Sequence, residues 1–139
     1  MQGTIGFIGC GRLGQALLKG WLASEVVQPE TVLIHTKRSG QQTAATFGVR
    51  SVPLDVLLRE AQTIILAVKP YQAQAILEDT TFSPSHLVIS TMAGVPTREL
   101  EAWVAPARVV RTMPNVGCQI GQGATVAFGG ERAAPACRR

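Results

Sequence analysis

Residues 4–14 read Thr4-Ile5-Gly6-Phe7-Ile8-Gly9-Cys10-Gly11-Arg12-Leu13-Gly14 and predict how the whole chain folds. A short apolar run leads into the spacing Gly9-x-Gly11-x-x-Gly14, and a helical pattern follows directly and ends near Ser24. A strand, a glycine-rich turn and a helix in this order make up the dinucleotide-binding fingerprint in the setting that it requires. An ordinary tight turn between a strand and a helix is the alternative interpretation.

Each of the three glycines meets a separate physical demand. Gly9 lets the chain turn sharply out of a buried strand, and Gly11 lacks a Cβ, so that a pyrophosphate can approach the backbone. Gly14 allows the helix to pack closely on the strand. The free N–H groups and the positive dipole end of the helix that opens near Arg12 would face the phosphates. The stretch therefore predicts a nucleotide-binding turn.

Strand patterns and helix patterns alternate along the rest of the chain. We expect further strands at residues 31–35, 49–52, 63–68, 86–91, 108–111 and 124–128, and helices at residues 41–47, from Pro53, at 71–77 and at 96–104. The continuous apolar run from Thr63 to Val68 is typical of a parallel strand that is covered on both faces. The sequence therefore predicts an α/β fold of the Rossmann type, with a doubly wound, mostly parallel sheet and helices on both faces.

The length of 139 residues fits one compact domain. We expect a dinucleotide-binding domain at residues 1–128. Residues 129–139 show neither a periodic pattern nor an apolar face. Chain ends of this kind are commonly poorly ordered, so we expect a disordered tail there.

Composition and charge argue against several other classes of protein. Hydrophobic residues make up 46% of the chain and charged residues 16%, which argues against disorder. No apolar run reaches the roughly 18–20 residues that span a bilayer, and the first residues do not resemble a basic secretory signal, so we expect a cytoplasmic protein. The net charge of +4 comes without a basic block or helix face, which favours anionic small molecules over nucleic acid as partners.

The cysteines and histidines predict neither a metal site nor a catalytic residue. Cys10, Cys118 and Cys137 are odd in number and lack CxxC spacing, so we expect no disulfide framework and no metal. His35 and His86 fall at a strand end and a strand start, and the chain has neither GxSxG nor HExxH. We expect both histidines at surface or capping positions.

The residues after the second strand favour NADP(H) over NAD(H). In domains that prefer NAD, a carboxylate at the end of this strand binds the ribose 2′-hydroxyl. Here the chain reads His35-Thr36-Lys37-Arg38-Ser39 and offers no carboxylate. A 2′-phosphate would find two cations and two hydroxyls, and an arginine suits a phosphate through its planar set of donors. The alternative is that Lys37 and Arg38 are a solvated pair of surface charges. NAD(H) is the alternative cofactor.

Five segments occur in a characteristic order, namely Ile5–Gly11, Ala67–Pro70, Ser90–Val95, Val110–Asn115 and Gly121–Thr125. In this order and spacing they resemble pyrroline-5-carboxylate reductase, an enzyme that makes proline by reducing a cyclic imine with NAD(P)H. The likeness covers residues 3–128. It implies an NADPH-dependent oxidoreductase that acts on the C–N bond of 1-pyrroline-5-carboxylate and belongs to a homo-oligomeric family.

Carried over residue by residue, the resemblance implies a set of cofactor contacts. The pyrophosphate would be contacted by Ile8, Gly9, Cys10, Gly11, Arg12, Leu13 and Gly14. The ribose and nicotinamide side would be lined by Ala67, Val68, Lys69 and Pro70, and the nicotinamide would be flanked by Thr91, Met92 and Ala93. Asn115 would lie near the reacting ring of the substrate. A merely solvated lysine is the alternative for Lys69.

The chain departs from the family pattern in two ways. Val116-Gly117-Cys118 stands where family members usually carry Thr-Pro. The family's C-terminal helical domain, which builds the oligomer and closes the substrate pocket, is not found in this sequence, so the catalytic residues stay unknown.

We therefore expect a cofactor-binding half with little or no activity by itself, and an exposed apolar patch that drives association. The alternatives are a non-catalytic NADP-binding fragment and a related NADP-dependent dehydrogenase of small hydroxy acids or imines.

Overall fold

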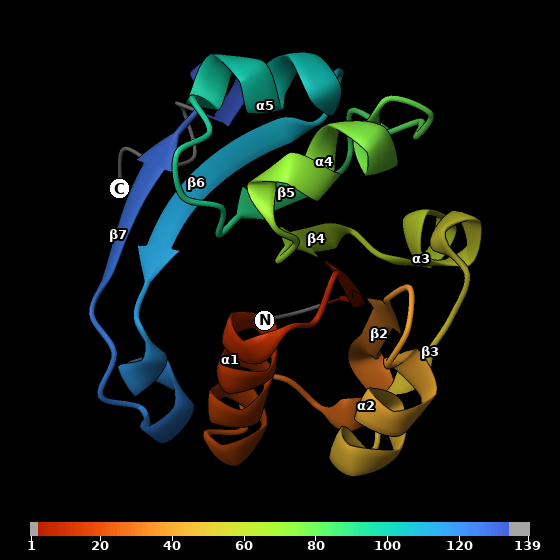
Figure 1. Ribbon diagram of the computed structural model, residues 1–139, viewed down its shortest axis with the longest axis vertical. Coiled ribbons are helices and arrows are strands. Elements are labelled where there is room, and N and C mark those ends of the chain that lie inside the picture. The colour runs from red at the N-terminus through yellow and green to blue at the C-terminus, as the bar shows by residue number, and fades with distance from the viewer. Residues whose placement is uncertain (1–2, 134–139) are drawn as a thin grey trace.

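Seven strands form one sheet in residues 3–133, the part of the chain that the computed structural model describes (Figure 1). They are β1 (Ile5–Ile8), β2 (Val32–His35), β3 (Arg50–Ser51), β4 (Thr63–Leu66), β5 (Leu87–Ser90), β6 (Arg108–Pro114) and β7 (Thr125–Gly129). Their order across the sheet is β3-β2-β1-β4-β5-β6-β7. Neighbours are parallel from β3 to β6, whereas β6 and β7 are antiparallel. The sheet grows first from β1 toward β3 and then from β4 toward β7, which places a topological switch point between β1 and β4.

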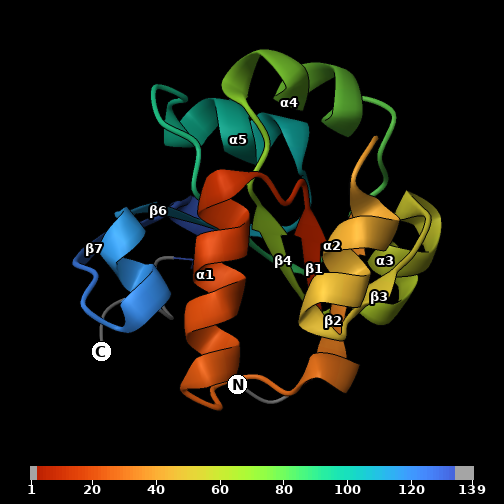
Figure 2. The same ribbon diagram turned by 60° about the horizontal axis from the view of Figure 1, so that its bottom comes forward.

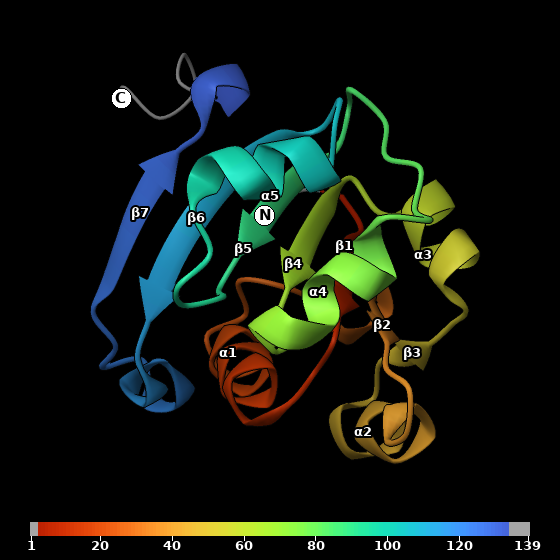
Figure 3. The same cartoon turned by 45° about the horizontal axis from the view of Figure 1, so that its top comes forward.

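Helices cover both faces of this sheet (Figures 2 and 3). α1 (Arg12–Ala23) and α2 (Gly40–Phe47) pack on one face, and α3 (Leu54–Glu60), α4 (Pro70–Leu77) and α5 (Thr97–Trp103) pack on the other. The 3-10 helices η1 (Pro29–Thr31), η2 (Val116–Ile120) and η3 (Glu131–Ala133) lie in connecting segments. The predicted α/β fold, doubly wound with a mostly parallel sheet, is confirmed. Among the described residues, no helix combines the length and the apolar character that a membrane crossing needs.

Alternate residues of the central strands point to opposite faces of the sheet, as strand geometry requires. On β4, Ile64 and Leu66 join the core cluster under α3, α4 and α5, whereas Ile65 joins the cluster under α1 and α2. Ile5 and Phe7 of β1 lie in the second cluster and are fully buried. A strand that is buried on both faces has a continuous apolar sequence, which is why β1 and β4 could be predicted.

The chain beyond residue 128 differs in part from the predicted tail. β7 runs through Gly129, and η3 follows with Ala133 buried. Arg132 fastens η3, because its Nε donates to the carbonyl oxygen of Ala107 at 2.9 Å and its backbone N–H donates to the Glu101 carboxylate at 3.4 Å. The expectation of disorder therefore does not hold for residues 129–133, whose contacts are long-range and leave no local pattern. The rest of the predicted tail, residues 134–139, lies outside the described residues.

The two histidines have different environments. His86 is buried, so a surface position is wrong for it: its Nδ1 accepts the backbone N–H of Ser83 at 3.0 Å, and its Nε2 lies 3.0 Å from the carbonyl oxygen of Leu58. This pairing caps the turn before β5 and joins it to α3. His35 is half-buried at the end of β2, with Nδ1 3.2 Å from the carbonyl oxygen of Val52.

Candidate functional site

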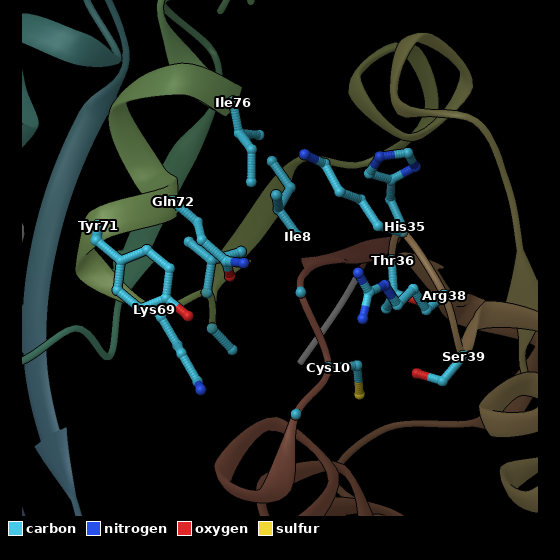
Figure 4. A pocket seen from close by; sticks show the side chains of 15 residues that line it. Ile8, Cys10, His35, Thr36, Arg38, Ser39, Lys69, Tyr71, Gln72 and Ile76 are labelled. Carbon is cyan, nitrogen blue, oxygen red and sulfur yellow. The ribbon is translucent and has the colours of Figure 1, made fainter.

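A cavity of about 550 Å³ opens at the carboxyl ends of β1, β2 and β4 (Figure 4). Parallel α/β sheets bind ligands at this edge, beside the switch point. The glycine loop after β1 forms the central part of the cavity wall. The segment after β2 lies on one side of that loop, and the segment after β4 with the start of α4 lies on the other. The residues that line the cavity and were predicted as cofactor contacts are Ile8, Gly9, Cys10, Gly11, His35, Thr36, Lys37, Arg38, Ser39, Ala67, Val68 and Lys69.

Gly9 shapes the turn that leads out of β1. Its φ of +79° lies in the left-handed region, which residues with a side chain rarely adopt. A Cβ at this position would lie 2.5 Å from Cγ1 of Val68 and 2.8 Å from the carbonyl oxygen of Ala67. The Gly9 N–H donates to the carbonyl oxygen of His35 at 2.9 Å, so the loop is also tied to the end of β2. This geometry agrees with the sharp turn predicted for Gly9.

Gly11 faces open space. A Cβ added there would meet no atom of the described residues within 4 Å, so the fold itself does not require glycine at this position. Gly14, one turn into α1, is packed instead: its Cβ would lie 3.2 Å from the Cβ of Ala67. The helix begins at Arg12 with Gly11 as N-cap and without a side-chain cap, so its first N–H groups are left for water or a ligand. A helix N-terminus beside an open glycine is suited to an anion.

Cys10 lies between these glycines and points inward, 3% exposed. Burial raises the pKa of its thiol to about 11, since the thiolate would lose its hydration. The thiol is therefore neutral at physiological pH and puts no negative charge beside the loop. Gln15 steadies the turn from the other side, because its Nε2 donates to the Cys10 carbonyl oxygen at 3.1 Å.

The side of the cavity after β2 is cationic and rich in donors. Lys37, Arg38 and Ser39 are exposed, and neither cation forms a salt bridge within the described residues. The hydroxyl oxygen of Thr36 is buried without a hydrogen-bond partner among those residues, which leaves a donor for a bound group. No Asp or Glu of the described part of the chain lines the cavity. The electrostatic character of the site therefore favours a ligand with several negative charges.

The opposite side includes three α4 residues that the sequence analysis missed, namely Tyr71, Gln72 and Ile76. Tyr71 is 75% exposed, and the Lys69 ammonium lies 5.9 Å from the centre of its ring. Gln72 and Ile76 are four residues apart and so share one face of the helix (Figure 4). The sequence held a usable signal, because a helix that starts directly at the end of a central strand turns one such face toward the ligand edge.

The remaining predicted contacts do not line this cavity. Arg12, Leu13 and Gly14 form the first turn of α1 behind the glycine loop, and Pro70 begins α4. Ala93 is exposed after β5, whereas Met92 is buried in the core. The pyrophosphate contacts of Arg12, Leu13 and Gly14 stay predictions. The roles of Pro70, Met92 and Ala93 on the nicotinamide side stay predictions as well.

Thr91 and Asn115 have structural hydrogen bonds. The Thr91 hydroxyl donates to the carbonyl oxygen of Leu66 at 3.0 Å and so joins the ends of β4 and β5. Asn115 is exposed and caps η2, its Oδ1 accepting the Gly117 N–H at 3.0 Å. The cap fixes the loop that follows β6, and a place for Asn115 near the substrate stays a prediction.

A second cavity, of about 400 Å³, lies between α1, the sheet and the loop around η2. Leu17, Trp21 and Ile65 are among its apolar walls. Two of its hydroxyls are already bonded to backbone, since Thr91 donates to Leu66 and Thr112 donates to the carbonyl oxygen of Ser90 at 3.2 Å. This second cavity therefore has few free polar groups with which to recognise a ligand.

The family of the chain follows from residues 4–94, which match the family model described as "NADP oxidoreductase coenzyme F420-dependent". The chain belongs to this family. Within the NADP oxidoreductases, it is 35% identical over 137 residues to a pyrroline-5-carboxylate reductase of Methanosarcina acetivorans, covering 94% of this chain and 51% of that protein. It is also 35% identical over 124 residues to the pyrroline-5-carboxylate reductase of Thermus thermophilus, covering 87% of this chain and 46% of that protein.

Solved structures of such reductases have the same fold. The Plasmodium falciparum pyrroline carboxylate reductase with NADP bound superposes with a TM-score of 0.82 at 25% identity, over 94% of this chain and 49% of that one. The predicted likeness to pyrroline-5-carboxylate reductases is thus confirmed. The chain spans about half the length of the curated relatives it matches.

The residues of this chain fit a dinucleotide in three observable ways. The space beyond Gly11 is open, the first N–H groups of α1 have no side-chain cap, and the Thr36 hydroxyl lacks a partner within the described residues. Each feature would be satisfied by phosphate or ribose oxygens. Within residues 3–133 the cavity walls offer cations, hydroxyls and backbone donors, which bind and orient a ligand but do not form a paired nucleophile and base.

Proposed function

We propose that this chain binds NADP(H) in the 550 Å³ cavity and supplies the cofactor-binding part of an NADPH-dependent pyrroline-5-carboxylate reductase. The reaction would reduce the small cyclic imine 1-pyrroline-5-carboxylate to proline, in the cytoplasm. The reductases to which the chain is similar support the reaction, and one of them was solved with NADP bound. The observation that carries the cofactor part is an open glycine loop beside Lys37 and Arg38, which form no salt bridge among the described residues, in a cavity that none of their carboxylates lines.

Binding would divide among three parts of the cavity. The pyrophosphate would lie against Gly11 and the N-terminus of α1, where the helix dipole and free N–H groups favour negative charge. Arg38 and Lys37 would hold the 2′-phosphate, with Thr36 and Ser39 adding hydroxyl donors. The adenosine would lie between the ends of β2 and β4, beside the apolar side chain of Ile76.

The reductase chemistry would use the site mainly for orientation. The bound dinucleotide supplies the hydride, which is chemistry of the cofactor rather than of the protein. Ala67 and Val68 would line the ribose and nicotinamide side, and Gly14 holds α1 against Ala67 so that this wall keeps its position. Holding both reactants in one geometry contributes much of the rate in such reactions.

Calorimetric titration with NADPH and with NADH tests the cofactor proposal. We expect saturable binding with a preference for NADPH. Arg38→Ala should weaken NADPH binding roughly ten- to a hundredfold, because a charge-assisted bond to phosphate is lost, and should change NADH binding much less. Lys19→Ala is the matched control, since Lys19 is an exposed cation on α1 outside the cavity. Equal losses for both cofactors in Arg38→Ala would contradict the 2′-phosphate assignment.

The reaction is tested separately by following the oxidation of NADPH with 1-pyrroline-5-carboxylate, and the reduction of NADP⁺ with small hydroxy acids. Turnover of the cyclic imine alone supports the reductase. Turnover of a hydroxy acid alone would favour the related dehydrogenase, and binding of NADPH without turnover of either would favour a non-catalytic dinucleotide-binding chain. The titration and the assay can fail independently, so each part of the proposal is judged by its own measurement.

A further inference from the structure

His35, the last residue of β2, uses only one of its two ring nitrogens within the fold. Its Nδ1 lies 3.2 Å from the carbonyl oxygen of Val52, the residue that follows β3. Its Nε2 has no hydrogen-bond partner among the described residues, and the side chain lines the 550 Å³ cavity. One nitrogen of the ring is therefore available to a ligand.

The contact with Val52 fixes the tautomer of this ring. A carbonyl oxygen only accepts hydrogen bonds, so Nδ1 carries the proton of the neutral imidazole and donates it to Val52. Nε2 keeps its lone pair and acts as an acceptor. His86 has the opposite tautomer, because its Nδ1 accepts the backbone N–H of Ser83 and its Nε2 donates to the carbonyl oxygen of Leu58. The two histidines of the chain therefore differ in which nitrogen is protonated.

The side chain of His35 lies in the apolar part of the cavity. His35 pairs with Ile8 in the parallel register of β1 and β2, so both side chains point to the face of the sheet that α3 and α4 cover. Val68 and Ile76 are partly buried against the core cluster of the same face. Figure 4 shows His35 on one side of this part of the cavity and Ile76 on the other, with Ile8 between them in the view. An apolar slot with one acceptor suits a flat aromatic ring that carries a hydrogen-bond donor.

The groups suited to anions lie toward the other face of the sheet. Gly11 and Ser39 are the N-caps of α1 and α2, the helices that pack on the face opposite to α3 and α4. In Figure 4, Arg38 and Ser39 lie on the Cys10 side of the cavity, away from Ile76. A lone pair on Nε2 of His35 matches a donor and not a phosphate oxygen. The neutral ring is therefore suited to a part of the ligand other than its phosphates.

We propose that His35 selects the adenine base of the bound dinucleotide, with Nε2 accepting a hydrogen bond from the exocyclic amino group. This amino group is the only donor of an adenine joined to ribose, because the ring nitrogens only accept. Hypoxanthine carries a carbonyl oxygen at the same position and would set two acceptors against each other. Gln72 on the α4 wall does not discriminate in this way, since an amide offers both a donor and an acceptor. The inference rests on the proposed function, because it requires a dinucleotide in this cavity, and adds a choice among bases.

Calorimetric titration with NADPH and with its deamino analogue, in which hypoxanthine replaces adenine, tests the selection. The titrations are run at about pH 8.5, above the range in which histidine changes its charge. We expect the analogue to bind about tenfold more weakly than NADPH, because Nε2 then faces a carbonyl oxygen with no proton between them. In His35→Asn the shorter amide can still donate to Val52 but offers no acceptor at the position of Nε2. NADPH should therefore bind to His35→Asn as weakly as the analogue does.

His35→Gln is the second variant, and its longer amide reaches the position of Nε2. Because this amide can turn either its oxygen or its nitrogen toward the base, it should bind NADPH and the deamino analogue with nearly equal affinity. Arg38→Ala is the matched control. It should weaken both dinucleotides by the same factor, since both carry the 2′-phosphate. Circular dichroism checks that each variant is folded.

A ¹⁵N NMR spectrum of the imidazole rings tests the tautomer. We expect one ring protonated at Nδ1 and the other at Nε2, and the signals that disappear in His35→Asn identify His35. Addition of NADPH should shift the Nε2 resonance of His35 much more than addition of the deamino analogue. His86 is the internal control, because it precedes β5 at the opposite edge of the sheet and its resonances should stay in place.

Three results would overturn this inference and leave the proposed function intact. One is equal affinity of the unsubstituted chain for NADPH and for the deamino analogue. Another is an equal loss for both dinucleotides in His35→Asn, since the ring would then contact the ribose or only support the fold. The third is a His35 ring that is protonated at Nε2. A chain that does not bind NADPH at all would contradict the proposed function, and this inference with it.

Discussion

At the scale of single residues, we expect Gly9 to be needed for the stability of the fold and Gly11 for the binding of the cofactor. Gly11 has a φ of −74° and a ψ of −161°, which other residues adopt, and a Cβ there meets no described atom within 4 Å. We therefore expect Gly11→Val to unfold at the temperature of the unsubstituted chain but to lose at least about tenfold in affinity for NADPH, because the side chain would occupy the space of the pyrophosphate. Thermal denaturation and calorimetric titration measure the two effects.

Gly9→Ala is the contrasting variant. Its Cβ would be forced against Val68 and Ala67 at a positive φ, so we expect a loss of about 2 kcal/mol or more in the free energy of unfolding. Unchanged NADPH binding in Gly11→Val would show that the space beside Gly11 is not where the pyrophosphate lies.

Sequence reasoning could identify residues whose role is fixed by local chemistry. The glycine loop and the segment from His35 to Ser39 line the cavity because each follows directly from a strand end. Tyr71 and Gln72 were missed because no local motif marks them, and the signal for them lies in the position of α4 directly after a central strand. Asn115 was assigned by family likeness, whereas its amide oxygen caps η2 in the structure.

At the scale of elements, the packing of α1 against η2 depends on Gly20. A Cβ at this position would collide with the carbonyl oxygen of Cys118, a backbone atom of the loop. In an isolated helix Gly→Ala would stabilise by about 1 kcal/mol. Here we expect Gly20→Ala to lower the free energy of unfolding by about 1–3 kcal/mol, or to displace the loop, because overpacking outweighs helix propensity.

Urea unfolding and the rate of thiol labelling measure these effects, since Cys118 is half-buried in the displaced loop. Lys19→Ala, at the neighbouring exposed position of α1, is the control and should change neither quantity. A more stable Gly20→Ala chain with unchanged labelling would mean that α1 and η2 do not pack in this way.

Elements with long apolar runs were predictable, and elements held by distant partners were not. β4 and β1 follow from their sequences because both faces are buried. β6 was expected at residues 108–111 but extends to Pro114, because Met113 and Pro114 pair with Val126 and Thr125 far along the chain. The antiparallel direction of β7 and the existence of η3 likewise depend on long-range contacts that no local pattern records.

At the scale of the whole molecule, the buried thiol of Cys10 makes stability depend on pH. In the unfolded chain this thiol ionises near its ordinary pKa of 9.0, whereas burial raises the pKa to about 11 in the folded chain. Between these values the unfolded state releases a proton that the folded state retains, so unfolding becomes more favourable as the pH rises. Relative to Cys10→Ala, the unsubstituted chain should lose about 2 kcal/mol of unfolding free energy from pH 9 to pH 11.

Urea denaturation of both proteins at a series of pH values measures this difference. The variant serves as the reference, because it carries every other group that titrates in the same range. Below about pH 8, roughly one unit under the unfolded pKa, the difference between the two proteins should be constant, because both states then keep the proton. A difference that stayed constant up to pH 11 would mean that the Cys10 thiol is accessible to water in the folded protein.

The strand order determines when the residues of the cavity are synthesised relative to the rest of the sheet. Within residues 3–133, the residues that line the 550 Å³ cavity lie between Ile8 and Ile76, and β5, β6 and β7 contribute none. On a growing chain, all of these residues are therefore synthesised before the second half of the sheet. β1 must nevertheless wait for β4, because it lies between β2 and β4 and cannot be completed by its immediate successor. Substitutions in β5, β6 and β7 therefore change none of the side chains that line this cavity within residues 3–133.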